Sequence, residues 1–538
     1  MPFARSTTVF TSALFLSLAL TGCGALATAP AAVTPGSTPS SDAVALPGAI
    51  EEQVRLALEQ LPDIAQRGLD STGVPGMSIA VVFQDEVVFA EGFGVREVGT
   101  DEEITPDTVF QIASLSKPLS ATAVSAAIAE GDVEWETPIR TLLPEFEYSE
   151  PTVTELATVG DAFSHRTGLI TGAGDDLEDL GFDRDTILQR LRLQPLDDFR
   201  STYHYSNFGL TVGAEAVAAA RGQEWEDLVA ELVFDPIGME STSARHDDFL
   251  SHPDRALLHA LIDGEYVAEF DRDPDAEAPA GGVSSTVNDL AQWLRVLLGE
   301  GELAGTQIAD REALIAAMSP QIVSSHPATG VERPAHYGHG FNASPLVSGR
   351  MSISHSGAFV LGAATNFQVV PELDLGIVVL TNGAPIGLPE AVTASFLDVV
   401  QFGDVTRDWV SDFGAFFGPM MGPVGDLVDA DRPANPTAAP TDADITGLYV
   451  SDYFGTLEVE RDGDALVARL GAEGNVALEL EEWDGATFAY SPTSESAPWG
   501  SRATATFNIG GEGAATQLRL SSFDGTGLGT FTRVWLNR

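Results

Sequence analysis

Ser114-Leu115-Ser116-Lys117, followed by Pro118 and an Ala-rich run to Ala129, is the stretch that decides the fold. Residues three apart on a helix share a face, so the Ser114 hydroxyl and the Lys117 amine can touch there. Pro118 is tolerated only in the first turn of a helix, which places Ser114 at or near the helix start. Backbone N–H groups at such an end favour a developing negative charge. The pattern therefore predicts a nucleophilic serine with an amine partner.

Lys117 is the only lysine in the chain, although Lys and Arg together number 27. Arginine cannot replace lysine as a proton acceptor, because its guanidinium stays protonated. To act as a base, Lys117 needs its pKa to fall from about 10.4 towards neutrality, a differential stabilisation of roughly 4 kcal/mol. Burial beside a strand would supply that shift. A leftover surface lysine is the alternative, but it would need no special neighbours.

The composition sets limits on function. A chain of 538 residues with 44% apolar and 20% charged residues is expected to form two globular units. Asp and Glu total 79, so the formal net charge is −52. Such a chain repels phosphate backbones, and we expect no nucleic-acid partner. The acidity is interpreted as a solvated surface.

The N-terminus indicates export. An apolar run from Val9 to Leu20 follows Arg5, too short for a membrane span and typical of a secretory signal over residues 1–22. Leu20-Thr21-Gly22-Cys23 contains the only Cys and resembles the bacterial lipoprotein signal, which implies lipidation of Cys23. Residues 23–47, rich in Ala, Pro, Ser and Thr, are expected to tether the fold to an extracytoplasmic membrane face. An ordinary signal peptide with an incidental Cys is the alternative.

Hydrophobic periodicity divides the rest into three parts. Residues 48–400 predict an α/β (α+β) domain in which early and late strands build one sheet around a helical insert. Residues 401–440 are interpreted as a linker or an irregular packing segment, and residues 441–538 as a small all-β domain, sandwich or barrel. Helices are expected at 50–61 (kinked or ended by Pro62), 114–129, 184–193, 208–221, 224–234, 286–299 and 310–318. Strands are expected at 77–82, 87–93, 352–354, 365–370, 375–381, 448–453, 456–460, 465–470, 487–490, 503–509, 517–521 and 529–535.

Two later motifs, Tyr205-Ser206-Asn207 and His355-Ser356-Gly357-Ala358, follow Ser114 in an order that resembles the serine β-lactamase and penicillin-binding family. The resemblance covers residues 50–400 and is strongest to the branch of class C β-lactamases, D,D-carboxypeptidases and esterases. The final β domain resembles one that is often attached to these hydrolases; a role in shielding or shaping the cleft is a hypothesis. Supporting segments are 110–113, 164–169, 236–239, 281–285 and 381–383.

The resemblance implies an antiparallel sheet flanked by helices with a helical subdomain, and an acyl-enzyme mechanism. Ser114 would attack a carbonyl while Lys117 and the Tyr205 phenol exchange the proton. The backbone N–H groups of Ser114 and Ala358 would form the oxyanion hole. Asn207 would hold Lys117 and bind a substrate carbonyl. We expect a small-molecule or peptide substrate, and no metal or cofactor is implied.

His355 departs from the family pattern, which usually has Lys or Arg there. With Gly357 it is expected to line the substrate side of the cleft. Histidine, with a reference pKa near 6.5, is mostly uncharged at neutral pH, whereas a carboxylate-binding site prefers a permanent cation. We therefore rank esterase, amidase or peptidase action first. A cell-wall D,D-carboxypeptidase or β-lactamase is second, and an inactive scaffold or sensor is the alternative from another class.

Other polar residues admit a structural as well as a functional interpretation. His165 could belong to a Ser-His-Asp triad, but a scaffold role is favoured. His336 and His339 could suggest zinc, although a loop in a Gly-rich stretch is the better interpretation. The acidic run at 175–179 is interpreted as a solvated loop rather than a calcium site.

Overall fold

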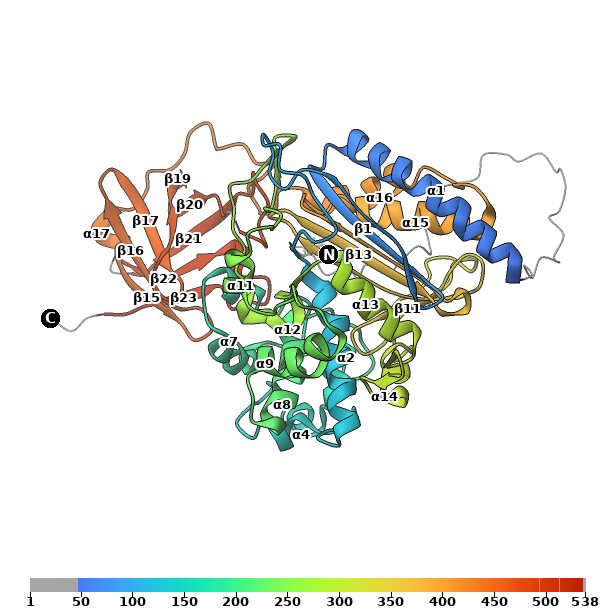
Figure 1. Cartoon of the computed structure of the whole chain (residues 1–538). Helices are drawn as coiled ribbons and strands as arrows, with labels where there is room; N and C mark the ends of the chain where they lie inside the picture. The colour runs from blue at the N-terminus through green and yellow to red at the C-terminus, as the bar shows by residue number, and fades with distance from the viewer. Residues whose placement is uncertain (1–46, 493, 512, 536–538) are drawn as a thin grey trace. The chain divides into compact units, whose positions relative to one another are not determined.

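The computed structural model describes residues 47–535 apart from 493 and 512, and divides the chain into two compact units (Figure 1). The large unit comprises, of these residues, 47–173 and 184–421. The small unit contains residues 174–183 together with those from 422 onward. Each unit has its own sheet. The predicted fold class is confirmed: an antiparallel sheet with helices, followed by an all-β domain.

The large unit is built on an eight-stranded antiparallel sheet in the order β2-β1-β14-β13-β12-β11-β10-β9. Early strands therefore pair with late ones, as expected from the two clusters of strand signals. Its strands are β1 (Gly76–Phe83), β2 (Glu86–Gly94), β9 (Ile322–Ser325), β10 (Ala335–Tyr337), β11 (Asn342–Pro345), β12 (Met351–Phe359), β13 (Ala363–Val370) and β14 (Leu375–Thr381).

The strands expected at 77–82 and 87–93 are present and form a hairpin. Gln84 and Asp85 join β1 to β2 with φ values of 51° and 61°, the left-handed pair that a two-residue hairpin turn requires. Every residue of β1 is buried, because helices cover both faces of the central strands. This explains why the strand reads as a continuous apolar run.

One face of the sheet, here called the apolar face, packs against α1 (Pro47–Thr72) and α15 (Leu388–Phe402) (Figure 1). Of the two predicted effects of Pro62, an end of the helix is wrong, since α1 continues ten residues beyond it to Thr72. Leu61, Ile64 and Leu69 are buried on both sides of the proline, so burial offsets the missing backbone hydrogen bond.

The opposite face, here called the reactive face, carries α2 (Ser116–Glu130) and α13 (Val287–Leu298). Helix α8 (Asn207–Arg221) packs beside α2 (Figure 1). All the helices predicted between residues 184 and 318 are present. The remaining helices of this unit are α3 (Ile139–Leu142), α4 (Pro151–Leu156), α5 (Val159–Phe163), α7 (Arg184–Arg190), α9 (Trp225–Val229), α10 (Asp235–Ile237), α11 (His246–Ser251), α12 (Ala278–Gly281), α14 (Arg311–Ala317) and α16 (Trp409–Phe417). Its short strands are β3 (Phe110–Gln111), β4 (Ala260–Ile262), β5 (Glu265–Val267), β6 (Ser284–Ser285), β7 (Glu302–Leu303) and β8 (Thr306–Gln307).

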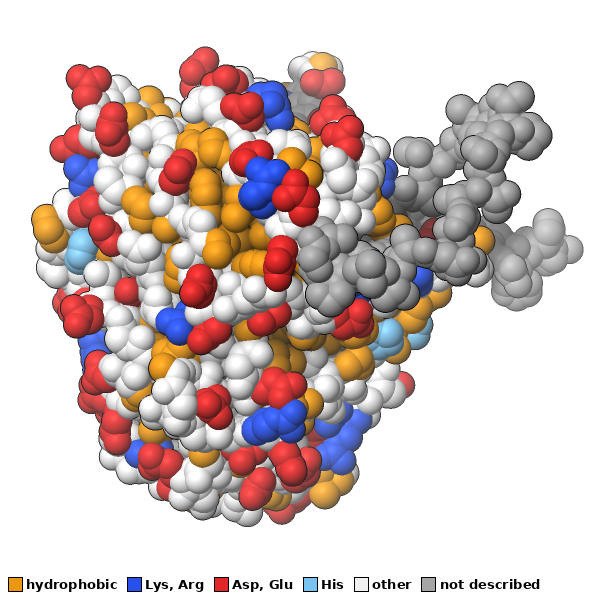
Figure 2. Space-filling model, turned by 45° about the vertical axis from the view of Figure 1, so that its right-hand side comes forward, with side chains coloured by type: hydrophobic (Ala, Val, Ile, Leu, Met, Phe, Trp, Pro, Cys, Tyr) orange, Lys and Arg blue, Asp and Glu red, His pale blue; other side chains and the backbone are white. Residues whose placement is uncertain are grey.

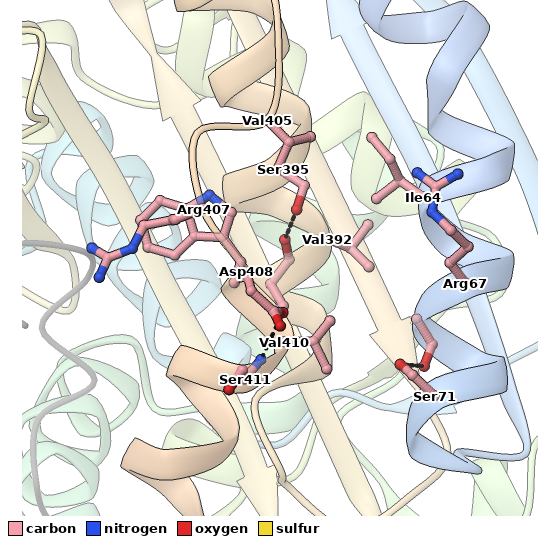
Figure 3. Close-up of a pocket in the computed structure, with 13 residues that line it drawn as sticks. Ile64, Arg67, Ser71, Val392, Ser395, Val405, Arg407, Asp408, Val410 and Ser411 are labelled. Carbon is pink, nitrogen blue, oxygen red and sulfur yellow. Dashed lines mark hydrogen bonds between the residues drawn. The ribbon is translucent and has the colours of Figure 1, made fainter.

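The segment after residue 401 begins with folded structure rather than an open linker. Helix α16 packs Trp409, Phe413 and Phe417 against Ala391 and Ala394 of α15. A pocket of about 420 Å³ lies between α1, α15 and the start of α16 (Figure 3).

The small unit is a nine-stranded antiparallel sheet in the order β18-β17-β16-β15-β23-β22-β21-β20-β19. Its two edge strands are consecutive in sequence with only Leu480 between them, so the sheet curls until it is nearly closed. The sequence predicted seven of these strands but not β18 and β19, which are short and rich in Glu. The elements are β15 (Gly447–Ser451), β16 (Gly455–Asp462), β17 (Ala465–Leu470), β18 (Val476–Glu479), β19 (Glu481–Asp484), β20 (Thr487–Tyr490), β21 (Ala503–Ile509), β22 (Ala515–Leu520), β23 (Thr530–Arg533) and α17 (Asp442–Ile445).

Residues 174–183 belong to the small unit although they interrupt the large one in sequence. They contain α6 (Asp175–Asp179), whose Leu177 is fully buried. The Tyr453 hydroxyl donates to Asp176 at 3.0 Å, and the Ser494 hydroxyl donates to Asp179 at 2.8 Å. The interpretation of this acidic run as a solvated loop is therefore wrong, because its acids accept hydrogen bonds from the β domain.

Acidic side chains are spread over the face shown in Figure 2, in keeping with the net charge of −52. No helix among the described residues is long and apolar enough to cross a membrane.

Candidate active site

Ser114 lies in a 3₁₀ turn (Ala113–Leu115) that leads directly into α2. The preceding residue, Ala113, has φ = +48°, a left-handed conformation that is strained for a residue with a Cβ. Ser116 holds this turn: its hydroxyl donates to Ala113 O at 2.7 Å and accepts from Val283 N at 3.0 Å. The predicted position of Ser114 at the helix start is confirmed, with Pro118 as the third residue of α2.

Lys117 is completely buried and donates three hydrogen bonds. Its Nζ lies 3.0 Å from Ser114 Oγ, 2.7 Å from Asn207 Oδ1 and 2.9 Å from Ala280 O. The amide and carbonyl oxygens can only accept, so they occupy two hydrogens of the amine. When the amine is protonated, its third hydrogen points to Ser114 Oγ. When the amine is neutral, a lone pair takes that place and points at Ser114, which is the arrangement that a general base needs.

The Tyr205 hydroxyl donates to Ser114 Oγ at 2.7 Å. Lys117 Nζ also lies 4.5 Å from the centre of the Tyr205 ring. Tyr205 stands just before α8, whose first turn is fixed by the Ser206 hydroxyl accepting from Gly209 N at 3.0 Å. The structure thus brings together the three groups that the sequence selected from segments about 90 residues apart.

His165 supports the Tyr205 segment. Its carbonyl accepts from His204 N at 3.0 Å, its Nδ1 accepts from Ser206 N at 3.3 Å, and its ring lies 4.7 Å from the Tyr205 ring. Burial holds the pKa of His165 well below its usual value, and the charge of Lys117 adds to the effect. A neutral ring that accepts from a backbone amide acts as a support, as the scaffold interpretation expects.

Asp161 fixes the same region through two arginines. Its carboxylate is buried and accepts from Arg166 at 2.7 Å and from Arg200 at 2.7 Å. Burial alone would raise the pKa of Asp161, but the hydrogen bonds from Arg200 and Arg166 outweigh it and leave the pKa lowered. Arg200 N also donates to Arg166 O at 2.7 Å, which joins the two loops that flank Tyr205 and His165.

Strand β12 passes directly against the backbone of Ser114. A Cβ on Gly357 would lie 2.2 Å from Ile112 O and 3.0 Å from Ser114 N, so only glycine permits this approach. Thr365 on the neighbouring strand donates to Ile112 O at 2.9 Å and fixes the contact. Ala358 is the next residue of β12, and its pairing with Ser114 as an oxyanion hole stays a prediction.

His355 is buried on β12 and has both ring nitrogens in use. Its Nδ1 donates to Ser356 O at 2.6 Å, and its Nε2 accepts from the Tyr337 hydroxyl at 2.9 Å. These partners assign the neutral tautomer. Burial, aided by the charge of Lys117, lowers the pKa of His355 to about 3, so this position carries no cation at neutral pH.

Two contributors to the site, Tyr337 and the Ala280 carbonyl, are not among the residues predicted from the sequence. Tyr337 lies on β10 inside Ala-His-Tyr-Gly-His-Gly, where only the histidines were considered. His336 is a residue of β10, which corrects the loop interpretation. His339 Nδ1 forms a hydrogen bond of 2.7 Å with Ser164 Oγ, and its ring stacks on Trp135 with 4.4 Å between the ring centres. No sequence pattern marks the Ala280 carbonyl, because every residue type has a backbone carbonyl.

The β-lactamase family model matches residues 61–398, which is more than half of the chain. The chain belongs to the β-lactamase family. A domain of unknown function (DUF3471) matches residues 431–530, within the small unit.

Individual relatives of this β-lactamase-family chain have names that indicate different activities. An unguisins hydrolase of Aspergillus violaceofuscus is 24% identical, covering 83% of this chain and 82% of that protein. Esterase EstB of Burkholderia gladioli is 30% identical over 34% of this chain and 50% of its own length. The octameric penicillin-binding protein homologue from Pyrococcus abyssi superposes with a TM-score of 0.58 at 19% identity, covering 88% of this chain and 99% of that one, which shows a shared fold.

Proposed function

We propose that this β-lactamase-family protein is a serine hydrolase that cleaves esters, amides or peptides through an acyl-enzyme on Ser114. The observation that carries the proposal is the meeting of Lys117 Nζ and the Tyr205 hydroxyl at Ser114 Oγ, at 3.0 and 2.7 Å. A nucleophile flanked by a buried amine and a phenol has a route for its proton on both sides.

In the acylation step, Ser114 Oγ bonds to the substrate carbonyl carbon and its proton passes to Lys117. The carbonyl electrons move onto oxygen, where the N–H groups of Ser114 and Ala358 would stabilise them. When the carbonyl re-forms, the bond to the leaving group breaks and Tyr205 supplies a proton to it, regaining one from Lys117. A water molecule then attacks the acyl group, gives its proton to the same pair, and releases the acid with Ser114 restored.

Esterase-type action is favoured by the lack of a positive charge at position 355 of β12. His355 is neutral, with its ring nitrogens engaged by Tyr337 and Ser356, so it offers no cation to a substrate carboxylate. A β-lactam or a C-terminal peptide carboxylate would lack its usual partner at this position. Neutral esters and amides have no such requirement, and one relative carries the name esterase.

The test is labelling with a fluorophosphonate and a fluorescent penicillin, followed by mass mapping. We expect a fluorophosphonate adduct on Ser114 that the Ser114→Ala variant lacks, and faster turnover of short-chain esters than of a chromogenic cephalosporin. Preferential cephalosporin turnover would favour the β-lactamase or D,D-carboxypeptidase alternative. Failure of both probes to modify Ser114 would favour an inactive scaffold.

We further propose that the protein is exported and lipid-anchored through Cys23, which lies outside the described residues. Support comes from the sequence Leu20-Thr21-Gly22-Cys23 after a short apolar run. In a bacterial host, labelled fatty acid should enter the full chain and leave the Cys23→Ser variant unlabelled. A Cys23→Ser variant that stays labelled and in the membrane fraction would exclude this anchor.

A further inference from the structure

Glu277 and Arg272 form a buried ion pair that the catalytic scheme does not use. Arg272 Nη2 donates to Glu277 Oε1 at 3.2 Å, and the two residues are only 2% and 7% exposed. Burying two charges costs much of what their attraction returns, so such a pair adds little to stability by itself. Glu277 stands directly before α12, the short helix whose Ala280 carbonyl accepts from Lys117 Nζ at 2.9 Å. The ion pair therefore adjoins a segment that holds the catalytic amine.

The Glu277 carboxyl lies against the backbone that follows Ala280. A Cβ on Gly281 would lie 2.6 Å from Glu277 Oε1 and 3.1 Å from Glu277 Cδ. The φ angle of Gly281 is not positive, so this glycine is needed for the close approach of the carboxyl and not for a turn. The Glu277 carboxyl is thus packed against the residue next to the carbonyl that Lys117 uses.

Arg272 ties this carboxyl to the two strands nearest Ser114. The backbone O of Arg272 accepts from Gln111 Nε2 at 2.8 Å, and Gln111 lies on β3, three residues before Ser114. The Arg272 guanidinium lies 5.1 Å from the centre of the Phe359 ring at the end of β12. Phe359 belongs to one apolar cluster with Ala113. Arg272 is therefore held by contacts that lie outside α12.

Helix α12 also packs against α2, the helix that carries Lys117 (Figure 1). The Ser120 hydroxyl of α2 donates to Pro279 O at 2.6 Å. Val283 N, just after α12, donates to Ser116 Oγ at 3.0 Å. These bonds fix residues on either side of Ala280 in the sequence, and the Glu277 carboxyl adds a contact at the residue directly after it. That last contact depends on the partner of the carboxyl, Arg272.

We propose that Glu277 and Arg272 are positioning residues. Their ion pair, packed against the end of α12, holds the Ala280 carbonyl on Lys117 Nζ. The carbonyl oxygen stabilises the ammonium form of Lys117 and fixes the direction in which the amine faces the nucleophile. Without this acceptor the ammonium is less stable and the amine is less well aimed. The inference deepens the proposed hydrolase function and rests on it only for the kinetic effect.

Gly281→Ala tests the contact without changing a charge. The added Cβ must displace either the Glu277 carboxyl or the backbone of α12, because a carbon 2.6 Å from Oε1 overlaps it. The matched control is Gly414→Ala in α16, where a Cβ would meet nothing within 4 Å. A second variant combines Arg272→Gln with Glu277→Gln. It removes the ion pair, keeps the net charge and leaves no charge buried alone, so it should fold.

The protonation of Lys117 can be followed without activity. Lys117 is the only lysine, so the full chain labelled with carbon-13 at the lysine ε-carbon gives one side-chain NMR signal. The titratable groups that face Lys117 are Tyr205, His165 and His355. Burial holds the pKa of His165 well below its usual value and lowers the pKa of His355 to about 3, so neither titrates near neutral pH. Tyr205 is the same in every variant.

We expect the midpoint of the Lys117 titration to fall by about 1 pH unit in Gly281→Ala and in the double variant, which is the effect of losing one hydrogen bond to a charged group. In Gly414→Ala the midpoint should equal that of the wild type. For hydrolysis of a short-chain nitrophenyl ester, kcat/KM of Gly281→Ala should be about tenfold lower, because small misplacements of reacting groups are costly. The acid limb of its pH profile should move to lower pH together with the NMR midpoint.

A midpoint that is unchanged or raised in Gly281→Ala would overturn the proposal. A loss of kcat/KM or of stability with the midpoint unchanged would give the ion pair a structural role only, and would overturn it as well. The hydrolase function can fail separately: if Ser114 resists every probe while the midpoint falls, that function is excluded and the positioning role of Glu277 and Arg272 stands.

Discussion

The two faces of the eight-stranded sheet bury different kinds of side chain. On the apolar face, residues such as Ile79, Val379 and Phe396 form one cluster whose stabilisation scales with buried area. On the reactive face, Lys117 and His355 are buried just as deeply, but each is held by named hydrogen-bond partners. The difference teaches that stability and reactivity are separable here. Changes on the apolar face should affect folding, and changes on the reactive face should affect turnover.

Replacing Tyr205 with Phe is the sharpest test on the reactive face. The variant loses only the hydroxyl that donates to Ser114, and we expect ester turnover to fall about 10³-fold, the range for removal of a proton-transfer group. Tyr266→Phe, which removes another buried phenol hydroxyl, should retain activity. Turnover of Tyr205→Phe within threefold of the wild type would contradict the proton-transfer role of the Tyr205 hydroxyl on the reactive face.

On the apolar face, the corresponding change is Phe396→Ala. Phe396 is fully buried on α15, and its loss should lower the free energy of unfolding by about 4 kcal/mol. Denaturant titration measures the loss, while kcat per folded molecule should stay unchanged. The matched control is Phe402→Ala on the same helix, where the side chain is 49% exposed and little stability should be lost.

Asp161→Asn tests the buried charge that supports the reactive face. Removing a carboxylate between Arg166 and Arg200 should destabilise the fold by about 3 kcal/mol at pH 7. The folded-state pKa of Asp161 is lowered, so its contribution is present above the unfolded value of 3.8 and is lost as pH falls through the folded pKa. The difference in unfolding free energy between wild type and variant should therefore shrink below pH 3.8. A difference independent of pH would assign the loss to packing instead.

The smallest expected effect concerns His355→Lys. A cation on β12 should raise kcat/KM for an ester bearing a free carboxylate by about tenfold relative to a neutral ester, since charge-assisted hydrogen bonds are roughly twice as strong as neutral ones. His355→Gln, which adds no charge, should leave the ratio unchanged. If the ratio of kcat/KM for the two esters were equal in both variants, charge on β12 would not be the basis of selectivity.

Ser114, Lys117 and Tyr205 could be found from the sequence because each of them carries its own signal. Lys117 is unique in composition, Ser114 lies one helical turn before it, and Tyr205 stands in a recognisable motif. The fold followed from strand signals at both ends of the domain. These inferences need only local patterns and the order of segments.

The rest depends on distances that no local pattern encodes. Tyr337 meets His355 because β10 and β12 lie in one sheet, separated by β11. Leu177 lies in an acidic run that favours a solvated loop, and only the structure shows that its side chain is buried in the small unit.

Because residues 174–183 fold with the small unit, the chain passes from one unit to the other after Ala173, after Asp183 and after Met421. A protease that nicks the backbone once between residues 422 and 440 would thus not liberate the β domain. The Tyr453–Asp176 bond and the bond from Ala472 N to Leu180 O would keep both fragments together in native gels. Two bands would appear only after denaturation, so purification at constant native mass is no proof of an intact backbone.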